Sequence, residues 1–297
     1  MSSITEKLVS WLFQTNAVKV CPEDSPFWYT SGTIGPYYIN THFLYGDEGK
    51  AEALLTSIDE WLEADRVTCL DRILEECKKN YSQDPLYREL IDAVCDFLKA
   101  RIDLTQVGCI SGGERRDWFF SLIVADMLGK PHVSILKDLE AVLSQGGTSE
   151  TTPNLSGAQV LHFADLITEA SSYRDKWIPA INRAGGQIRW SAVVVDRKQG
   201  GVEFLKGQGI EPYSMIDMDK DLFQGALELG LITDEQCDMI MQYIDDPRDS
   251  MRNFLTDHPG FLSQTLKGAP KTRERALKCI MENFYNLDEK TIKGLLN

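Results

Sequence analysis

The feature of the sequence that most constrains the fold is the stretch at residues 160–173. Its first half is apolar and contains Val160 and Phe163, which predicts a short buried strand, and its second half predicts the start of a helix. Small polar residues lie between the two, namely Thr168, Ser171 and Ser172. A strand, a small polar turn and a helix N-terminus together favour binding of a phosphate group, because unpaired backbone N–H groups and the helix dipole point toward the anion.

The composition is that of a globular protein, since 43% of the 297 residues are hydrophobic and 26% are charged. No run of about 18 apolar residues occurs, so no membrane span is expected. The N-terminus lacks the basic region and apolar run of a signal peptide, and residues 4–15 instead predict an amphipathic helix. Seven cysteines are scattered without C-x-x-C spacing, which predicts neither a disulfide framework nor a zinc site. We therefore expect a cytoplasmic protein.

The net charge of −14 argues against binding to nucleic acid, because such binding needs a basic surface that neutralises phosphates. The acidic excess lies in the flanking segments, 46–105 and 216–297, where helices with solvated faces are expected. The central segment, 106–215, holds 11 basic and 12 acidic residues. Enough cations remain there to receive an anionic small molecule.

Two patterns precede the central segment. Residues 27–40 predict two aromatic strands with a turn at Ser31 and Gly32, a pattern that fits an edge hairpin packed into a core. Residues 47–102 predict helices from their three- and four-residue apolar spacing, interrupted by a polar surface loop at 75–85.

The central segment begins with a predicted short strand at 106–110 and a turn. This turn contains Gly113, Arg115 and Arg116. Glycine lets the backbone approach a ligand closely, and the two arginines either have a functional role or form surface ion pairs with Glu114 and Asp117. We expect Asp117 to cap the helix that follows.

Three further strands are expected in the central segment, at 132–136, 188–195 and 212–216. The first is followed by a loop at 137–157 that is rich in Ser, Thr and Gly, and a loop of this length is either a lid or disordered. The second ends in the turn at 196–201.

Beyond the central segment, residues 217–297 predict helices. Thr233 and Gln236 form a capping box, and Asp288 is expected to cap a final helix. We expect these helices to dock onto the core or to form a dimer contact.

The stretch at 160–173 resembles the ribose-5-phosphate-binding signature of type I phosphoribosyltransferases. That signature consists of four apolar residues, two acidic residues, two apolar residues and a loop of threonine and small residues. The first acidic position is Ala164 here and the second is Asp165, so the motif is degenerate. The resemblance spans roughly residues 25–215 and points most to orotate phosphoribosyltransferases.

Two other stretches carry the resemblance to orotate phosphoribosyltransferases. Residues 27–40 resemble the N-terminal hood that covers the base, although Thr30 stands where the family usually has a lysine. The turn at 196–201 resembles the family's turn in which an arginine, here Arg197, meets the orotate ring.

The loop at 137–157 has the position of the family's flexible catalytic loop, which is usually rich in cations. Here Lys137 is the one base at its start, and Leu136, Glu140 and Val142 stand where the family tends to have cations. A carboxylate at this place opposes an anionic transition state.

The resemblance implies an α/β fold with a type I phosphoribosyltransferase-like core, in which a mainly parallel sheet is flanked by helices. An N-terminal hood and a helical C-terminal extension are added to this core. The implied modules are an N-terminal helix and hood at 1–45, a helical segment at 46–105, the α/β core at 106–216 and the C-terminal extension at 217–297.

The resemblance also implies a reaction, the Mg²⁺-dependent transfer of ribose 5-phosphate from phosphoribosyl pyrophosphate (PRPP) to orotate, and a homodimer. The implied catalytic residues are Lys137 and Asp165, and Asp165 also steers Mg²⁺ through water. The residues implied to bind PRPP are Thr168, Glu169, Ala170, Ser171, Ser172, Arg115, Arg116 and Gly113. Those implied to bind the base are Arg197, Tyr37 and Tyr38.

Two hypotheses of different classes follow. The hood and the turn at 196–201 favour an orotate phosphoribosyltransferase-like enzyme. Ala164, the negative charge of Glu169 within the phosphate-binding loop and the cation-poor loop at 137–157 favour a non-catalytic relative that binds a nucleotide or phosphosugar as a sensor or partner. A DNA-binding repressor with this core is a weaker alternative, since no basic helix-turn-helix module precedes the core.

Overall fold

The computed structural model describes residues 4–151 and 153–288. The chain forms two compact units. Unit 1 comprises Met1–Ala17 and Asn40–Met218, and unit 2 comprises Val18–Ile39 and Asp219–Asn297. These units are groups of residues in contact, and each combines segments that are distant in the sequence. The division of the chain into four successive modules therefore stays a prediction.

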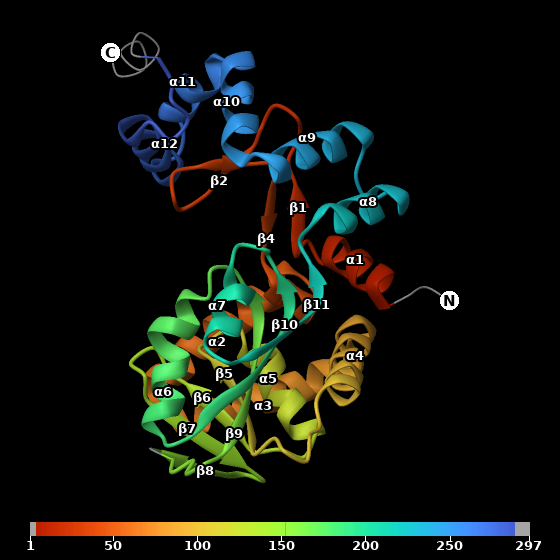
Figure 1. The fold of residues 1–297 in the computed structure, drawn as a ribbon, viewed down its shortest axis with the longest axis vertical. Coiled ribbons are helices and arrows are strands. Elements are labelled where there is room, and N and C mark those ends of the chain that lie inside the picture. Colours follow the sequence, from red (N-terminus) through yellow and green to blue (C-terminus); the bar gives the residue numbers. More distant parts are fainter. Residues whose placement is uncertain (1–3, 152, 289–297) are drawn as a thin grey trace. The chain divides into compact units, whose positions relative to one another are not determined.

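Unit 1 is built around a seven-stranded sheet in the order β11-β10-β9-β5-β6-β7-β8 (Figure 1). Neighbouring strands from β11 to β6 pair in parallel, and β7 and β8 add to one edge in antiparallel orientation. The expected α/β fold with a mainly parallel sheet is confirmed. The strands are β5 (Cys109–Gly113), β6 (His132–Ile135), β7 (Ala141–Gln145), β8 (Thr148–Thr151), β9 (Gln159–Ile167), β10 (Gln187–Asp196) and β11 (Glu211–Asp217).

The first strand of the sheet differs from its prediction. It begins at Cys109 rather than at residue 106, and it continues through Gly113. Gly112 and Gly113 were expected to form a turn. They extend the strand instead, because their backbones pair with Ser134 and Ile135 of β6.

The prediction of a weakly structured loop at 137–157 is wrong. Strands β7 and β8 form a hairpin within it, because Ala141 and Val142 are buried and pair with β6. The hairpin turns at Gly146 and Gly147, whose φ angles of +58° and +82° suit a glycine pair in a tight turn.

The prediction of a surface loop at 75–85 is also wrong, because α3 continues through these residues to Gln83. Cys77 and Asn80 face the interior while their polar neighbours lie outside, so the helical spacing continues through a polar sequence.

The predicted N-terminal helix is confirmed. The helices of unit 1 are α1 (Ile4–Gln14), α2 (Glu48–Ala64), α3 (Arg66–Gln83), α4 (Pro85–Arg101), α5 (Trp118–Met127), α6 (Ile178–Arg183) and α7 (Gly201–Gly207), with a 3₁₀ turn η1 (Thr41–Tyr45) and a π-helical turn η2 (Tyr173–Trp177).

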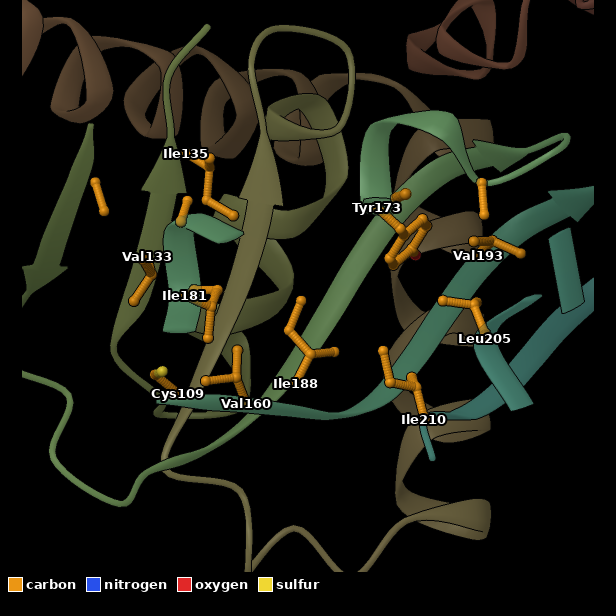
Figure 2. Packing of buried hydrophobic residues seen from close by; sticks show 14 of the residues in the cluster. Cys109, Val133, Ile135, Val160, Tyr173, Ile181, Ile188, Val193, Leu205 and Ile210 are labelled. Atoms are coloured by element: carbon orange, nitrogen blue, oxygen red, sulfur yellow. The ribbon is translucent and has the colours of Figure 1, made fainter. Parts of the chain in front are cut away.

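A hydrophobic cluster joins the sheet to α6 and α7. Figure 2 shows Val160 and Ile188 from the sheet, Ile181 from α6 and Leu205 from α7 among its members. Ala164 belongs to the same cluster and is fully buried. Because successive side chains of a strand point to opposite faces, the residue that follows it directs its side chain to the other face of the sheet.

Unit 2 contains the stretch expected to form the hood. The two aromatic segments do not pair with each other: β2 pairs with β3, and β4 pairs with β1. The aromatic pattern predicted strands but not the partners, because β1 has no turn signal that links it to β4. The strands are β1 (Val18–Val20), β2 (Phe27–Trp28), β3 (Ile34–Gly35) and β4 (Tyr37–Ile39).

The C-terminal helices pack against the hood strands. The Tyr285 hydroxyl accepts the Ile34 N–H at 2.8 Å, and the Arg275 guanidinium donates to the Trp28 carbonyl at 2.7 Å. The predicted capping box at the start of α9 is confirmed, and the predicted final helix after Asp288 lies outside the described residues. The helices are α8 (Lys220–Glu228), α9 (Asp234–Asp245), α10 (Pro247–Asp257), α11 (Gly260–Leu266) and α12 (Pro270–Glu282).

In the described ranges of both units, every helix is too short or too polar to cross a membrane.

Candidate functional site

The carboxyl end of the sheet in unit 1 contains a point where the strand order reverses. The chain continues from β5 to β6 on one side and from β9 to β10 on the other. The register of β5 with β9 ends at Ser111↔His162, whereas the register of β5 with β6 continues to Gly113↔Ile135. In open α/β sheets, ligands bind beyond the carboxyl ends of the strands at such a point.

Residues 168–172, here called the phosphate loop, connect β9 to the next helix. Backbone hydrogen bonds fix both ends: the Arg197 N–H donates to the Ile167 carbonyl at 2.9 Å, and the Arg174 N–H donates to the Ala170 carbonyl at 3.0 Å. Ala170 has a φ of +56°, a left-handed conformation that turns the chain from the strand into the helix.

The phosphate loop contains three hydroxyl side chains and one carboxylate. Within the described part of the chain, the hydroxyls of Thr168, Ser171 and Ser172 form no hydrogen bond. Glu169 is exposed. A Cβ atom placed on Gly201 would lie 2.4 Å from the Thr168 carbonyl oxygen, so the start of α7 packs directly against the loop.

A polar layer that sequence reasoning missed lies below the phosphate loop. The His162 ring packs 4.2 Å from the Trp177 ring and 5.0 Å from the Tyr173 ring. Its Nδ1 atom lies 2.9 Å from the Ser111 hydroxyl, and the Tyr173 hydroxyl lies 2.5 Å from that of Ser191. Burial lowers the pKa of His162 to about 3, so its ring is neutral.

The second candidate region is the cation loop, residues 114–117, which follows β5. Arg115 forms an ion pair with Asp59 of α2, rather than with a neighbour in its own loop. Arg116 is exposed and forms no hydrogen bond or ion pair with another described residue. Its charge nevertheless acts on Asp165: burial raises the pKa of that carboxyl, and the guanidinium of Arg116 opposes the rise. The structure therefore brings Arg116 near the acidic residue of the family signature.

The expectation that Asp117 caps α5 is wrong. One carboxyl oxygen of Asp117 accepts the Gly113 N–H at 2.9 Å, and the other accepts the Asp165 N–H at 3.0 Å. Its side chain is thus directed at the two strand ends instead of at the first turn of α5, where it makes no capping hydrogen bond. In the sequence, Asp117 is an acidic residue that follows two arginines. No neighbouring residue indicates that its carboxyl accepts hydrogen bonds from Gly113 and Asp165.

Asp117 and Asp165 form a buried pair, with exposed fractions of 5% and 8%. The pKa of Asp117 lies well above its ordinary value, because the carboxyl is buried and lies beside the charge of Asp165. Burial also raises the pKa of Asp165, while the guanidinium of Arg116 opposes this rise. Two adjacent buried carboxyls each disfavour the ionisation of the other.

The cations near the start of the predicted lid have acidic partners. The Lys137 ammonium lies 3.1 Å from Glu114, whose side chain is 9% exposed. Arg66 of α3 lies 2.6 Å from Asp138 and 2.9 Å from Glu140. The guanidinium of Arg66 thus offsets the negative charge that the sequence places in this segment.

The three residues predicted to bind the base are distributed over both units. In unit 1, Arg197 is half-buried and its backbone is anchored beside the phosphate loop. In unit 2, the Tyr37 ring is buried, with its centre 4.9 Å from that of Phe223 and 5.7 Å from that of Tyr243, while Tyr38 is 39% exposed. The role of these residues in base binding stays a prediction.

Asp165 is the residue predicted to bind a metal ion. In the described ranges, no group of three or more histidine, cysteine, aspartate or glutamate side chains is arranged to hold a metal ion. A single carboxyl suits a Mg²⁺ ion that keeps most of its water ligands, and this role of Asp165 stays a prediction.

Comparison with known proteins agrees with this geometry. No family model matches the sequence. The chain is 27% identical over 182 residues to the orotate phosphoribosyltransferase of Sinorhizobium medicae (strain WSM419), a match that spans 58% of this chain and 73% of the relative. It is 30% identical over 121 residues to the adenine phosphoribosyltransferase of Actinobacillus succinogenes, spanning 36% of this chain and 67% of the relative.

Among solved structures, that of Leishmania donovani UMP synthase shares the fold, with a TM-score of 0.52 at 14% identity, over 82% of this chain and 42% of that chain. The fold and the relatives define the class: the chain belongs to the type I phosphoribosyltransferase family. Within that family it is most like the orotate phosphoribosyltransferases.

Proposed function

We propose that the chain transfers ribose 5-phosphate from PRPP to orotate and releases pyrophosphate. The observation that carries the proposal is the convergence of three elements where the strand order reverses: the phosphate loop, Asp165 and the cation loop. A ligand with a phosphate at one end and a pyrophosphate at the other matches this arrangement. The orotate phosphoribosyltransferases among the relatives support the choice of acceptor.

In this proposal, backbone N–H groups at the start of the helix and the hydroxyls of Thr168, Ser171 and Ser172 bind the 5-phosphate. Asp165 accepts hydrogen bonds from the ribose hydroxyls. The bond between C1 of the ribose and the pyrophosphate oxygen breaks, and pyrophosphate leaves with the electron pair. N1 of orotate supplies the pair for the new bond to C1, and its proton passes to water.

The leaving pyrophosphate gains negative charge, which Arg115, Arg116 and Lys137 stabilise in this proposal. Mg²⁺, when bound with PRPP, supplies further positive charge to the pyrophosphate oxygens, and Asp165 would hold it through water. In unit 1, Arg197 is proposed to bind orotate, and the roles of Tyr37 and Tyr38 in unit 2 stay predictions. We also propose a cytoplasmic homodimer that acts on small molecules, without a nucleic acid or membrane partner.

The test is release of pyrophosphate from PRPP with Mg²⁺, measured with orotate and with a panel of other bases. We expect release with orotate. Asp165→Asn should reduce the rate of release about 100-fold or more, because loss of one preorganised group at a reacting centre commonly has an effect of this size. Asp175→Asn is the matched control, because Asp175 is exposed and pairs with Arg174. If pyrophosphate is released with another base but not with orotate, the reaction class is retained and orotate is refuted as the acceptor.

A second candidate function is binding of a phosphosugar or nucleotide without turnover. The internal pairing of Arg115 and Lys137 favours it, because paired cations are less available to a leaving group. Folded protein whose melting temperature rises with PRPP but which releases no pyrophosphate with any base would establish this second function.

A further inference from the structure

The carboxyl of Asp117 lies where β5 and β9 stop pairing. The pairing of β5 with β9 ends at Ser111↔His162. Beyond this point the N–H groups of Gly113 and Asp165 each donate a hydrogen bond to one carboxyl oxygen of Asp117. The two hydrogen bonds, here called the Asp117 bridge, measure 2.9 and 3.0 Å. One buried carboxyl thus connects the strand that leads into the cation loop with the strand that leads into the phosphate loop.

The bridge coincides with the degenerate position of the family signature. Ala164 has no carboxyl and is buried in the hydrophobic cluster beside α6. On the opposite face Asp165 lies next to the carboxyl of Asp117, which comes from the start of α5 instead of from the neighbouring strand position. The site therefore contains two acidic side chains, but they come from different parts of the sequence.

We propose that Asp117 is a positioning residue for PRPP: its carboxyl sets the distance between the phosphate loop and the cation loop. This inference rests on the proposed function, since it concerns how that ligand is held. Asp117 acts through the backbones of Gly113 and Asp165 and does not itself contact the ligand.

The affinities for PRPP and for its two fragments should depend on the bridge to different extents. Ribose 5-phosphate occupies the phosphate loop alone and pyrophosphate the cation loop alone, whereas PRPP must occupy both at once. A ligand that joins two subsites gains affinity only when the distance between the subsites matches its own length. Loss of the bridge should therefore weaken the binding of PRPP much more than the binding of either fragment.

The experiment measures the affinity of the full chain for ribose 5-phosphate, pyrophosphate and PRPP by calorimetry, each with Mg²⁺. The variants are Asp117→Asn, which keeps the size of the side chain but offers a single acceptor oxygen, and Asp126→Asn. The latter is a matched control on the helix that follows Asp117, because Asp126 is exposed and pairs with Lys78. We expect Asp117→Asn to bind PRPP at least tenfold more weakly and each fragment within about twofold of the wild-type affinity, and Asp126→Asn to bind all three like the wild type.

Each result bears on a different statement. An equal loss for all three ligands would show that Asp117 merely stabilises the fold and would overturn the inference, as would unchanged affinity for PRPP. If the wild-type chain binds none of the three ligands, the proposed function itself is refuted, and the inference falls with it.

A measurement on the wild-type chain covers the case in which Asp117→Asn does not fold. Pyrophosphate alone should slow hydrogen exchange at the Asp165 amide, because the bridge couples that amide to the cation loop. The amide of Asp217, at the end of β11, serves as a reference within the same sheet. Exchange at Asp165 that pyrophosphate does not alter relative to Asp217 would overturn the inference.

Discussion

The phosphate loop and the cation loop reach the same end of the sheet, but the structure holds them in different ways. Backbone hydrogen bonds at Ile167 and Ala170 shape the phosphate loop, and its hydroxyls keep no partner among the described residues. Side-chain ion pairs hold the cations of the other region, from Arg115 to Asp59 and from Lys137 to Glu114. A ligand can enter the first without displacing a contact, whereas it must compete for the cations of the second.

This difference teaches which part of the site is ready for a ligand. A loop shaped by its backbone is preorganised, and its contribution to binding carries no cost of breaking side-chain contacts. The affinity for a pyrophosphate group depends instead on the balance between internal and external ion pairs. The three changes below alter one side of the comparison at a time.

The largest effect is expected from Gly201→Ala, which acts on the phosphate loop. The new methyl group would lie 2.4 Å from the Thr168 carbonyl oxygen and 2.6 Å from Cγ1 of Ile167. The loop must move, and misplacement of a functional group by about 1 Å can cost a factor of about 100 in rate. We expect the affinity for ribose 5-phosphate, measured by calorimetry, to fall about 100-fold.

Gly207→Ala is the control for this change, since no heavy atom lies within 4 Å of its Cβ position. It should leave the affinity unchanged. Unchanged affinity in Gly201→Ala as well would show that the loop adapts to its neighbours and that its backbone is not preorganised.

A smaller effect concerns the support below the phosphate loop. The pKa of His162 is about 3 in the folded chain against 6.5 for an unperturbed histidine, because the ring is buried. Above pH 6.5 neither state binds the proton; below it the unfolded state does, so folding stability falls as the pH falls toward 3. In His162→Gln this contribution is absent, so the stability advantage of the wild type should shrink by about 2 kcal/mol between pH 8 and pH 5.

Urea unfolding at pH 5, 6.5 and 8 measures this difference. His42 and His132 are also buried with lowered pKa values, and they contribute equally to the wild type and the variant. His258→Gln is the control, because its ring is exposed. A constant difference between the wild type and His162→Gln at all three pH values would refute the assignment.

The smallest effect is expected from Asp59→Asn, which removes the partner of Arg115. An exposed ion pair is worth about 0–1 kcal/mol, so its loss should strengthen pyrophosphate binding by up to about fivefold. Glu60→Gln changes the neighbouring charge on α2 without freeing an arginine, and it should have little effect. Weaker binding in Asp59→Asn would mean that Asp59 orients Arg115 for the ligand and does not compete with it.

The sequence predicted those features that depend on local patterns. The apolar run before Asp165 indicated β9, the small polar residues indicated the phosphate loop, and the resemblance indicated the family. The capping box at Thr233 was also read correctly, because both of its partners lie within one turn of helix.

The features that the sequence did not predict depend on distant partners. The Asp117 bridge joins residues 48 positions apart, and the ion pair of Arg115 with Asp59 spans 56 positions. Glycine was taken as a turn signal at Gly113, but a neighbouring strand selects extended backbone there. Propensity and spacing describe a residue and its near neighbours, whereas tertiary contacts determine these outcomes.

Unit 2 is discontinuous in the sequence, and this has a consequence for synthesis of the chain. The Ile34 N–H finds its acceptor, the Tyr285 hydroxyl, 251 positions later. At about 5–20 residues per second, the ribosome adds that partner roughly 10–50 s after the strand has been made. During this interval unit 1 can complete its sheet, since its last strand ends at Asp217. The strands of 18–39 must wait for the C-terminal helices, so the two units are completed one after the other.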